Sequence, residues 1–333
     1  MSSFYNKTPL LRQIFHESHA PQVLVKYEFL QPSGSFKSRG IGHLISKRAQ
    51  LIRENKKVPV VFSSSGGNAG LAAAVACHML DISCTVVIPT TTKERMADKI
   101  KKCGANVIVE GSHWKEADCY VRDLLMRSLN KNEFESIYVH PFDDPIIWEG
   151  HATIVDEIIN SLSDQGVPLE KVKGIVCSVG GGGLYNGVIQ GLEKHGLANT
   201  IPVVAVETRG CHVLNESLQK GVRVEFGEVS SVATSLCSSY VSAATFDNAQ
   251  KYDSKSVVLE DREVLQTCLK YANNFNIITE PACGASIHLA YNPLLLERAL
   301  GSKFSPDDII IIIACGGSAA TIEGLKTSLQ SLT

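Results

Sequence analysis

The sequence has no C-x-x-C pair, no long apolar run and no excess of charge of either sign. Ten cysteines are scattered over 333 residues, which is typical of buried thiols in a reducing compartment rather than of a disulfide framework or a zinc site. The apolar runs fall far short of the roughly 18 residues that span a bilayer. With a net charge of −2, the chain has no overall field for nucleic acid or anionic lipid. We therefore expect small molecules or another subunit as partners, and neither nucleic acid nor a membrane.

The N-terminal stretch MSSFYNKTPLLRQIFHESH lacks a signal-peptide core, and its two basic residues are accompanied by the acidic Glu17. It is therefore a poor mitochondrial transit sequence. We expect a cytoplasmic location, with mitochondrial import left open. A content of 44% hydrophobic and 20% charged residues indicates a packed globular protein, and the length favours about two domains.

Short β-branched runs alternate with longer helical stretches along the chain. Examples are VPVVFSSS before NAGLAAAVACHML, CTVVIP before KERMADKIKKCG, and VKGIVCSVGGGG before LYNGVIQGLEKHG. This alternation is typical of parallel sheets covered by helices, so we predict an α/β fold of two doubly wound units with mostly parallel sheets. The segment 140–150, HPFDDPIIWEG, has two prolines and no hydrophobic period, which predicts a connection between the units.

Four consecutive glycines, Gly180, Gly181, Gly182 and Gly183, follow an apolar strand and precede a predicted helix. Successive backbone N–H groups can close on an anion there, and the N-terminus of the helix adds a favourable field. A loose turn that needs positive φ would explain one or two glycines but seldom four. The spacing matches neither G-x-x-x-x-G-K-[ST] nor G-x-G-x-x-G, so we predict that this loop binds the phosphate of a small cofactor.

A second turn, SSSGGNAG over residues 63–70, also joins a strand to a helix and supplies hydroxyls, exposed N–H groups and the carboxamide of Asn68. These donors suit a small carboxylate. An Asn cap with flexible glycines explains the same residues equally well. The turn alone therefore leaves both interpretations open.

The stretch QPSGSFKSRG places Lys37 in the first turn of a predicted helix. Most lysines are simply solvated, but a cation is unfavourable at the positive end of a helix. The same field would lower the pKa of Lys37 and make its amine a nucleophile toward carbonyls. A reactive lysine, a phosphate loop and a carboxylate loop together favour pyridoxal phosphate (PLP) with an amino-acid substrate.

The motifs PSGSFKSRG, SSSGGNAG, PFDDPIIWEGH, SVGGGG, EPACGA and CGGS occur in that order over nearly the whole chain. In this the chain resembles the fold-type II PLP enzymes, and most closely the catabolic L-serine/L-threonine dehydratases of fungal type. The resemblance implies a tryptophan synthase β-like fold, with a large PLP-binding domain (residues 1–45 and 139–333) and a small substrate-binding domain (residues 46–138). It also implies a homodimeric lyase that converts L-serine to pyruvate, or L-threonine to 2-oxobutanoate, with release of ammonia.

The resemblance also implies roles for single residues. Lys37 would form the Schiff base with PLP and remove the α-proton, and Cys315 would face the pyridine nitrogen, although a buried strand-end thiol is the alternative for Cys315. The glycine loop would hold the phosphate, and Asn68 would face the phenolic oxygen. Ser65, Gly66 and Asn68 would receive the substrate carboxylate. Gly66 stands where the related serine racemases carry a serine that moves a proton, so racemisation is not expected.

A monovalent cation, with potassium expected, is implied at the Glu207 side chain and the main-chain carbonyls of Cys211 and Leu236. An exposed strand-end glutamate is the alternative for Glu207. Cys237 departs from the glycine that the family usually has after the leucine of this segment. Biosynthetic threonine dehydratases of this fold add a C-terminal regulatory domain, so we expect no feedback control by isoleucine here.

Two other functions fit parts of the pattern. A β-replacement enzyme similar to cysteine synthase would use the same cofactor but add a nucleophile instead of releasing a 2-oxo acid. A non-catalytic protein that binds a phosphorylated metabolite would use the glycine loop and form no covalent bond at Lys37. The preference between serine and threonine depends on room for one methyl group, worth about 1 to 3 kcal/mol, and stays open.

Overall fold

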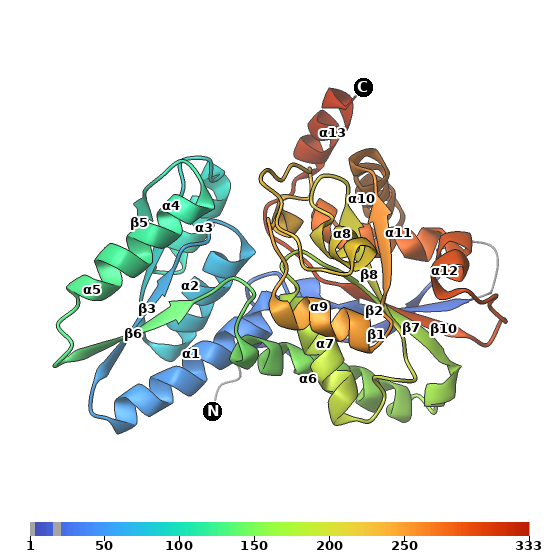
Figure 1. Ribbon diagram of the computed structural model, residues 1–333, viewed down its shortest axis with the longest axis horizontal. Coiled ribbons are helices and arrows are strands. Elements are labelled where there is room, and N and C mark those ends of the chain that lie inside the picture. The colour runs from blue at the N-terminus through green and yellow to red at the C-terminus, as the bar shows by residue number, and fades with distance from the viewer. Residues whose placement is uncertain (1–3, 16–20, 333) are drawn as a thin grey trace.

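The computed structural model describes residues 4–15 and 21–332, which form two α/β units that lie side by side (Figure 1). Glu17, the acidic residue of the N-terminal stretch, lies outside the described residues. One unit is built on a six-stranded sheet and the other on a four-stranded sheet. The predicted fold class, α/β with two mostly parallel sheets covered by helices, is confirmed.

The six-stranded sheet combines the two ends of the described chain with its middle. Its order is β1 (Leu10–Gln13), β2 (Gln22–Tyr27), β10 (Ile309–Ala314), β7 (Val172–Ser178), β8 (Val203–Thr208) and β9 (Lys255–Leu259). Among the described residues, β1 pairs with β2 in the antiparallel sense, and the other pairs of this sheet are parallel. Every residue of β10 is buried, as expected for a central parallel strand whose sequence is IIIIIA.

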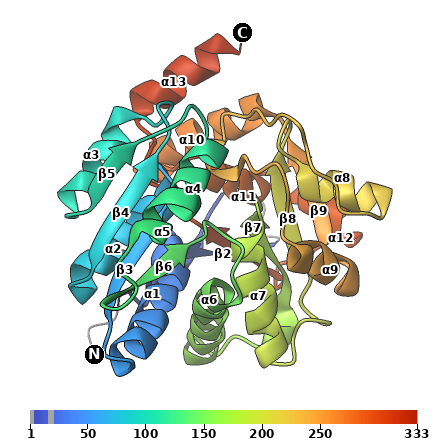
Figure 2. The ribbon, with the colours of Figure 1, turned by 60° about the vertical axis from the view of Figure 1, so that its left-hand side comes forward.

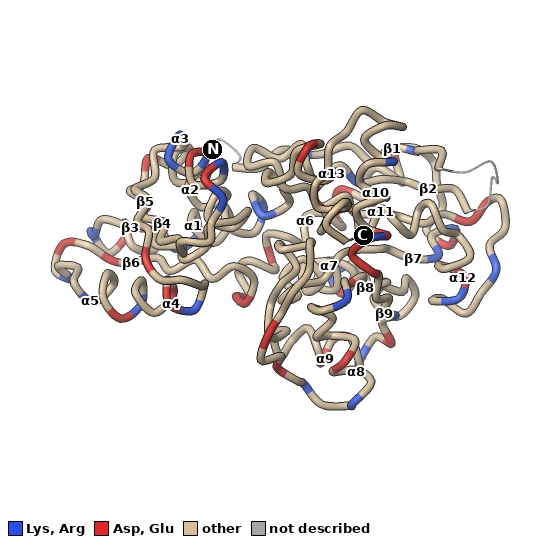
Figure 3. The backbone as a smooth tube through the Cα atoms, turned by 90° about the horizontal axis from the view of Figure 1, so that it is seen from above, with Lys and Arg blue, Asp and Glu red and all other residues tan. Residues whose placement is uncertain are grey.

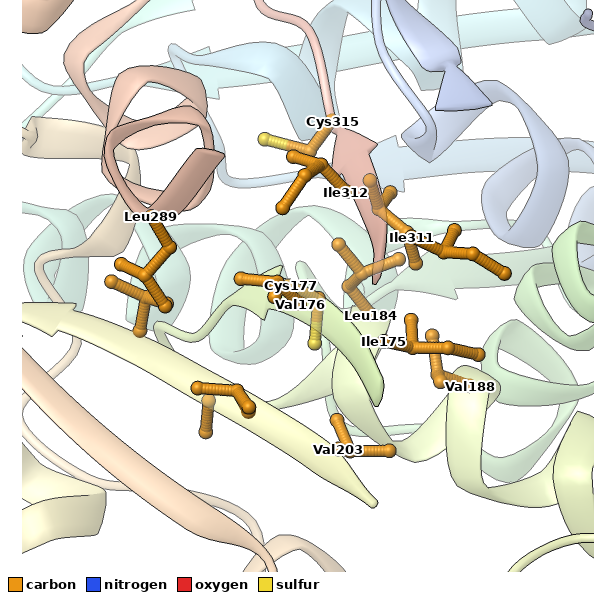
Figure 4. Packing of buried hydrophobic residues seen from close by; sticks show 14 of the residues in the cluster. Ile175, Val176, Cys177, Leu184, Val188, Val203, Leu289, Ile311, Ile312 and Cys315 are labelled. Carbon is orange, nitrogen blue, oxygen red and sulfur yellow. The ribbon is translucent and has the colours of Figure 1, made fainter. Parts of the chain in front are cut away.

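Helices cover both faces of this sheet. They are α6 (Pro145–Asp164), α7 (Gly183–Lys194), α8 (Val213–Lys220), α9 (Ala243–Lys251), α10 (Asp261–Phe275), α11 (Pro281–Tyr291), α12 (Pro293–Leu300) and α13 (Ile322–Ser331), with the short turns η1 (Glu28–Leu30), η3 (Leu169–Lys171) and η4 (Thr234–Leu236). Figure 4 shows Ile311 and Ile312 of β10 in one buried cluster with Ile175 of β7 and with Leu184 and Val188 of α7. This packing fixes the strand ends that carry the site.

The four-stranded sheet has the order β5 (Asn106–Val109), β4 (Ser83–Ile88), β3 (Val58–Ser63) and β6 (Phe134–Val139), and all its pairs are parallel. Its helices are α1 (Lys37–Glu54), α2 (Asn68–Leu80), α3 (Glu94–Lys102), α4 (Trp114–Cys119) and α5 (Met126–Ser128), with a π-helical stretch, η2 (Tyr120–Leu125), between the last two. The helix α1 begins at the junction of the two units and runs along the four-stranded unit (Figures 1 and 2), and it packs against both α2 and α6.

The predicted domain boundary between residues 45 and 46 falls inside α1. Ile41 and Leu44, which precede this boundary, belong to the buried core of the four-stranded unit. Because α1 contributes to both units, the division into residues 1–45 plus 139–333 and residues 46–138 stays a prediction.

The segment predicted as a connection, residues 140–150, is a connection only as far as Asp144. The Asp144 side chain accepts a hydrogen bond from the N–H of Ile146 at 2.9 Å, and Pro145 takes the first position of α6. Proline is favoured there because its missing N–H would have no partner inside the helix. The prediction was therefore wrong for residues 145–150, where the proline begins a helix.

Charged residues of both signs are distributed over both units (Figure 3), and no helix of the described part of the chain is long and apolar enough to cross a membrane. One group of charges is buried. The Arg39 guanidinium bonds to Glu28 at 2.7 and 2.8 Å and to Glu157 at 2.7 and 2.8 Å, and Lys26 Nζ donates to Glu157 at 2.6 Å. Two cations face two carboxylates, so this cluster ties β2, α1 and α6 together without net charge.

Candidate active site

The N-terminus of α1 lies beside the end of β10. The N–H of Phe36 donates to the main-chain oxygen of Cys315 at 3.0 Å, and the N–H of Gly317 donates to the oxygen of Gly34 at 2.8 Å. Because the carboxyl ends of parallel strands form the ligand crevice in such folds, these bonds place Lys37 at that crevice.

Lys37 is the first residue of α1, in the first turn as predicted. Its side chain is half-buried, and Nζ donates to the main-chain oxygen of Pro141 at 3.0 Å. Loss of water around the amine lowers the pKa of Lys37 from 10.5 to about 8, while Cys315 and Glu280 act in the opposite direction. The pKa is lowered as predicted, but burial is the main cause rather than the field of the helix. At neutral pH an appreciable part of this amine is therefore unprotonated.

In the protein without cofactor, we expect Lys37 to react with an amine-directed acylating reagent at a rate that rises through about pH 8 and then levels off. Only the neutral amine is nucleophilic, so a lysine with the ordinary pKa of 10.5 would continue to gain reactivity above that pH. Peptide mass spectrometry of protein labelled across about pH 6 to 11 measures this, with the exposed Lys47 of α1 as the internal comparison. Coinciding profiles for the two lysines would contradict the prediction.

Asn68 connects the two units. Its Nδ2 donates to Glu280 Oε2 at 2.9 Å and to Ser235 Oγ at 3.3 Å, and its Oδ1 accepts from the N–H of Ser318 at 3.0 Å. Gly67 is the N-cap of α2 and Asn68 follows it inside the helix, so the Asn-cap interpretation is wrong. The carboxamide is instead fixed between α2 and the segment after β10, with a defined orientation.

Glu280 is a site residue that was not predicted from the sequence. It is 3% exposed and directly precedes α11. Its carboxylate accepts from Asn68, from Ser235 Oγ at 2.7 Å and from the N–H of Ala319 at 2.7 Å. A glutamate before a proline is locally explained as a helix start, so EPACGA contained no local signal for this role. Glu280 holds Asn68 and the loop after β10 in place.

Cys315 directly follows β10 and is 4% exposed (Figure 4). Its thiol shares a hydrogen bond with Cys283 of α11, and this bond raises the pKa of Cys283 well above its ordinary value. The main-chain oxygen of Cys315 accepts from the N–H of Phe36, the residue before Lys37, so this cysteine lies at the end of α1 that carries Lys37. The contact between Cys315 and a pyridine nitrogen stays a prediction.

The glycine loop joins β7 to α7, as predicted, with Gly183 as the first helical residue. Within the described residues, no hydrogen bond from the N–H groups of 180–183 is found. Gly182 has φ +100°, a conformation that favours glycine, and a Cβ at Gly181 would lie 2.4 Å from the ring of Phe142. The loop therefore presents unpaired N–H groups at a helix N-terminus, which is the arrangement of an anion site.

Two buried hydroxyls near these elements have no partner in the part of the chain that the structure describes. They belong to Ser178, two residues before Gly180, and to Ser35, two residues before Lys37, which are 4% and 1% exposed. An unsatisfied buried polar group costs about 1 to 3 kcal/mol, and a polar ligand would remove this cost. Together with the unpaired loop N–H groups and the lysine of lowered pKa, these hydroxyls fit a cofactor that has a phosphate and a carbonyl.

Ser65 and Gly66 lie in the turn between β3 and α2, next to Asn68. Ser65 Oγ accepts from the N–H of Gly67 at 3.3 Å. A Cβ at Gly66 would lie 2.2 Å from Thr92 Oγ1, so this position has no room for a side chain. The role of Ser65 and Gly66 in carboxylate binding stays a prediction.

Glu207 is fully buried, so the alternative of an exposed strand-end glutamate is wrong. Its carboxylate accepts from the N–H groups of Leu214 at 2.8 Å and Asn215 at 2.7 Å, and burial nevertheless raises the pKa of Glu207 to about 8. Among the residues described, no group of three or more His, Cys, Asp or Glu side chains could hold a metal ion. The cation at Glu207 and the carbonyls of Cys211 and Leu236 stays a prediction.

The chain is similar to known proteins along its whole length, both in sequence and in structure. The model of a family described as "Pyridoxal-phosphate dependent enzyme" matches residues 1–316. The chain is 58% identical over 333 residues to a catabolic L-serine/threonine dehydratase of Saccharomyces cerevisiae, covering 100% of this chain and 92% of the relative. It is 55% identical over 330 residues to an L-serine dehydratase of the same organism, covering 98% of each. The crystal structure of a fungal L-serine ammonia-lyase from Rhizomucor miehei matches over 100% of both chains, with a TM-score of 0.86 and 31% identity.

Proposed function

The chain belongs to the family of pyridoxal-phosphate-dependent enzymes, and from this premise we propose that it is an L-serine/L-threonine dehydratase of amino-acid catabolism. The observation that best supports this proposal concerns Lys37. Its pKa is lowered to about 8, and it lies at the crevice near Cys315 and Glu280. Glu280 in turn holds Asn68. The serine and threonine dehydratases at 58% and 55% identity support this choice of reaction within the family.

When bound, PLP withdraws electrons from Cα of the amino acid and thereby acidifies its α-proton. We assign the transfer of that proton to Lys37 Nζ, because a pKa of about 8 lets it both accept and return a proton near neutral pH. The N–H groups of 180–183 would bind the phosphate, with Ser178 as a further donor. Asn68 Nδ2 would give up its 3.3 Å bond to Ser235 Oγ and donate to the phenolic oxygen of the ring. The Cys315 thiol would lie against the ring nitrogen.

We place the substrate carboxylate at the turn that contains Ser65, Gly66 and Asn68, because this turn opens the N-terminus of α2. At Gly66 there is no side chain, and Thr92 occupies the space that one would need. No proton carrier can therefore be built at Gly66. This favours elimination over racemisation, which needs a second acid/base on the opposite face.

Further features of the protein belong to the same proposal. We propose a cytoplasmic homodimer, and potassium at Glu207 with the carbonyls of Cys211 and Leu236. Glu207 is suited to a cation because it is buried and its charged form is disfavoured by burial alone. Dialysis against sodium-free and potassium-free buffer, with activity restored by potassium, tests the cation.

The test of function uses the purified protein with PLP and with L-serine or L-threonine as sole substrate. We expect pyruvate and 2-oxobutanoate, each with an equivalent of ammonia, and a reduced PLP adduct on Lys37 after treatment with borohydride. A β-replacement enzyme would show the adduct but would need an added thiol for turnover. A non-catalytic binding protein would show no adduct. Absence of 2-oxo acid from both substrates in PLP-saturated, folded protein would reject the dehydratase.

Gly181→Val is expected to weaken PLP binding at least about tenfold, a loss of about 1.4 kcal/mol. A side chain at this position collides with the Phe142 ring and displaces the loop whose N–H groups would bind the phosphate. Gly227→Val is the matched control, because Gly227 has open space around its Cβ position. Spectroscopic titration of the folded apo-proteins with PLP gives both affinities. Equal affinities for Gly181→Val and the unchanged protein would place the phosphate elsewhere.

A further inference from the structure

Two cysteines whose thiols have no part in the proposed catalysis or cation binding share a group of neighbours. Cys211 follows β8 and Cys237 follows η4, and their sulfurs contact a linked pair of hydroxyl residues, Thr208 and Ser231. Thr208 Oγ1 lies 3.0 Å from Cys211 Sγ and 2.8 Å from Ser231 Oγ, and Cys237 Sγ lies 3.8 Å from the main-chain oxygen of Ser231. These contacts hold both sulfurs in one small polar cluster.

This pair differs from the other pairs of neighbouring thiols of the described residues in its access to solvent. Cys211 is 1% exposed, but Cys237 is half-buried, and the exposed Thr234 and Ser235 precede it in the same loop. A small oxidant can therefore reach one sulfur of the pair. The members of the other pairs are all 8% exposed or less, namely Cys77, Cys84, Cys283 and Cys315.

The loop that carries Cys237 contacts the candidate active site directly. Two residues before Cys237, Ser235 Oγ donates to Glu280 at 2.7 Å and accepts from Asn68 Nδ2 at 3.3 Å. A displacement of this loop therefore changes the hydrogen bonds of the carboxylate and the carboxamide that define the crevice.

The same loop also supports the glycine loop. The residue before Cys237 is Leu236, whose main chain packs so closely on Gly180 that a Cβ there would lie 2.9 Å from the Leu236 oxygen. Movement of Cys237 toward Cys211 would displace the neighbouring Leu236 and change this contact. The proposed phosphate site and the Asn68–Glu280 contact thus depend on the same short segment.

We propose that Cys211 and Cys237 form a reversible disulfide that inactivates the enzyme when a hydroperoxide is present. The peroxide, ROOH, oxidises one thiol to a sulfenic acid and leaves as the alcohol, ROH. The second sulfur then attacks the sulfenyl sulfur, so that the S–S bond forms and water leaves. Two electrons pass from the sulfurs to the peroxide O–O bond, which breaks, and a dithiol reductant reverses the change.

Inactivation follows from the length of the new bond. A disulfide is about 2.05 Å long, which is shorter than any non-bonded contact between two sulfurs, so the segment around Cys237 must shift. A misplacement of about 1 Å can cost about a hundredfold in rate. The effect on activity rests on the proposed function, whereas formation of the disulfide does not.

The test treats the reduced, PLP-loaded full chain with hydrogen peroxide and digests it without reduction. We expect a peptide linked through Cys211 and Cys237 and at least about a tenfold loss of pyruvate formation, both reversed by dithiothreitol. Cys237→Ser should form no linked peptide and keep its activity in peroxide, and Cys237→Gly, which has the residue usual in the family, serves as a second variant. Cys103→Ser removes a half-buried thiol of the other unit and should behave like the unchanged protein.

Each outcome decides the proposal. Oxidation of other cysteines without the linked peptide overturns the disulfide, and a linked peptide with unchanged activity overturns the switch. Equal inactivation of both Cys237 variants by peroxide also overturns it. If the reduced protein forms no 2-oxo acid, the proposed function fails on its own. The affinity for PLP, weakened at least about tenfold in the oxidised protein, then decides the switch without an activity assay.

Discussion

Lys37→Ala is expected to lower kcat/KM for L-serine by at least about a thousandfold. The variant loses both the amine that would bond to the cofactor and the group that would move the α-proton. The Lys37 side chain donates one hydrogen bond, to Pro141, so its removal should leave the fold intact. Lys37→Arg should be equally inactive, because a guanidinium keeps the charge but does not release its proton.

A coupled pyruvate assay measures the loss, and circular dichroism verifies that the variants are folded. Lys47→Ala is the matched control, because Lys47 lies on the same helix and forms a half-exposed ion pair with Glu149 at 2.8 Å. Such pairs contribute little, so its activity should stay within about twofold of the unchanged protein. Retention of a tenth or more of the activity by Lys37→Ala would remove Lys37 from the catalytic step.

The features that were predictable from the sequence have local causes. Four glycines between a β-branched run and a helical run predict a strand, a loop and a helix start, and the structure has all three. Lys37 could be placed in the first turn of a helix because the helical pattern begins directly after it. Both predictions depend on neighbours within about ten residues, which a sequence displays in order.

The features that were not predictable depend on contacts between distant segments. Glu280 meets Asn68 across 212 positions of the chain, and nothing near either residue signals the other. The lowered pKa of Lys37 was predicted from the field of the helix, and this cause was wrong for the same reason. The helix field depends only on the first turn, whereas burial depends on the whole fold. An exposed position was a possible but wrong interpretation of Glu207, because the end of a strand can face either water or a core.

Arg39→Leu is expected to lower the free energy of unfolding by about 3 to 5 kcal/mol. Arg39 is fully buried and bonds to both Glu28 and Glu157, which then keep Lys26 as their remaining cation. A buried carboxylate without its partner is costly because it has lost both water and the opposite charge. Arg39→Lys should have an intermediate effect, because an ammonium keeps the charge but lacks the fork that reaches two carboxylates.

Urea denaturation followed by circular dichroism measures this loss, with Arg53→Leu as the control on the same helix. Arg53 is exposed, and its side chain makes one long hydrogen bond, to the main-chain oxygen of Leu80 at 3.4 Å, so its replacement should change the free energy by less than about 0.5 kcal/mol. Because Arg39 lies two residues after Lys37, its bonds to Glu28 of η1 and Glu157 of α6 also fix the start of α1. An Arg39→Leu protein as stable as the Arg53→Leu control would show that Lys26 alone balances the two carboxylates, and that the start of α1 is positioned by its packing.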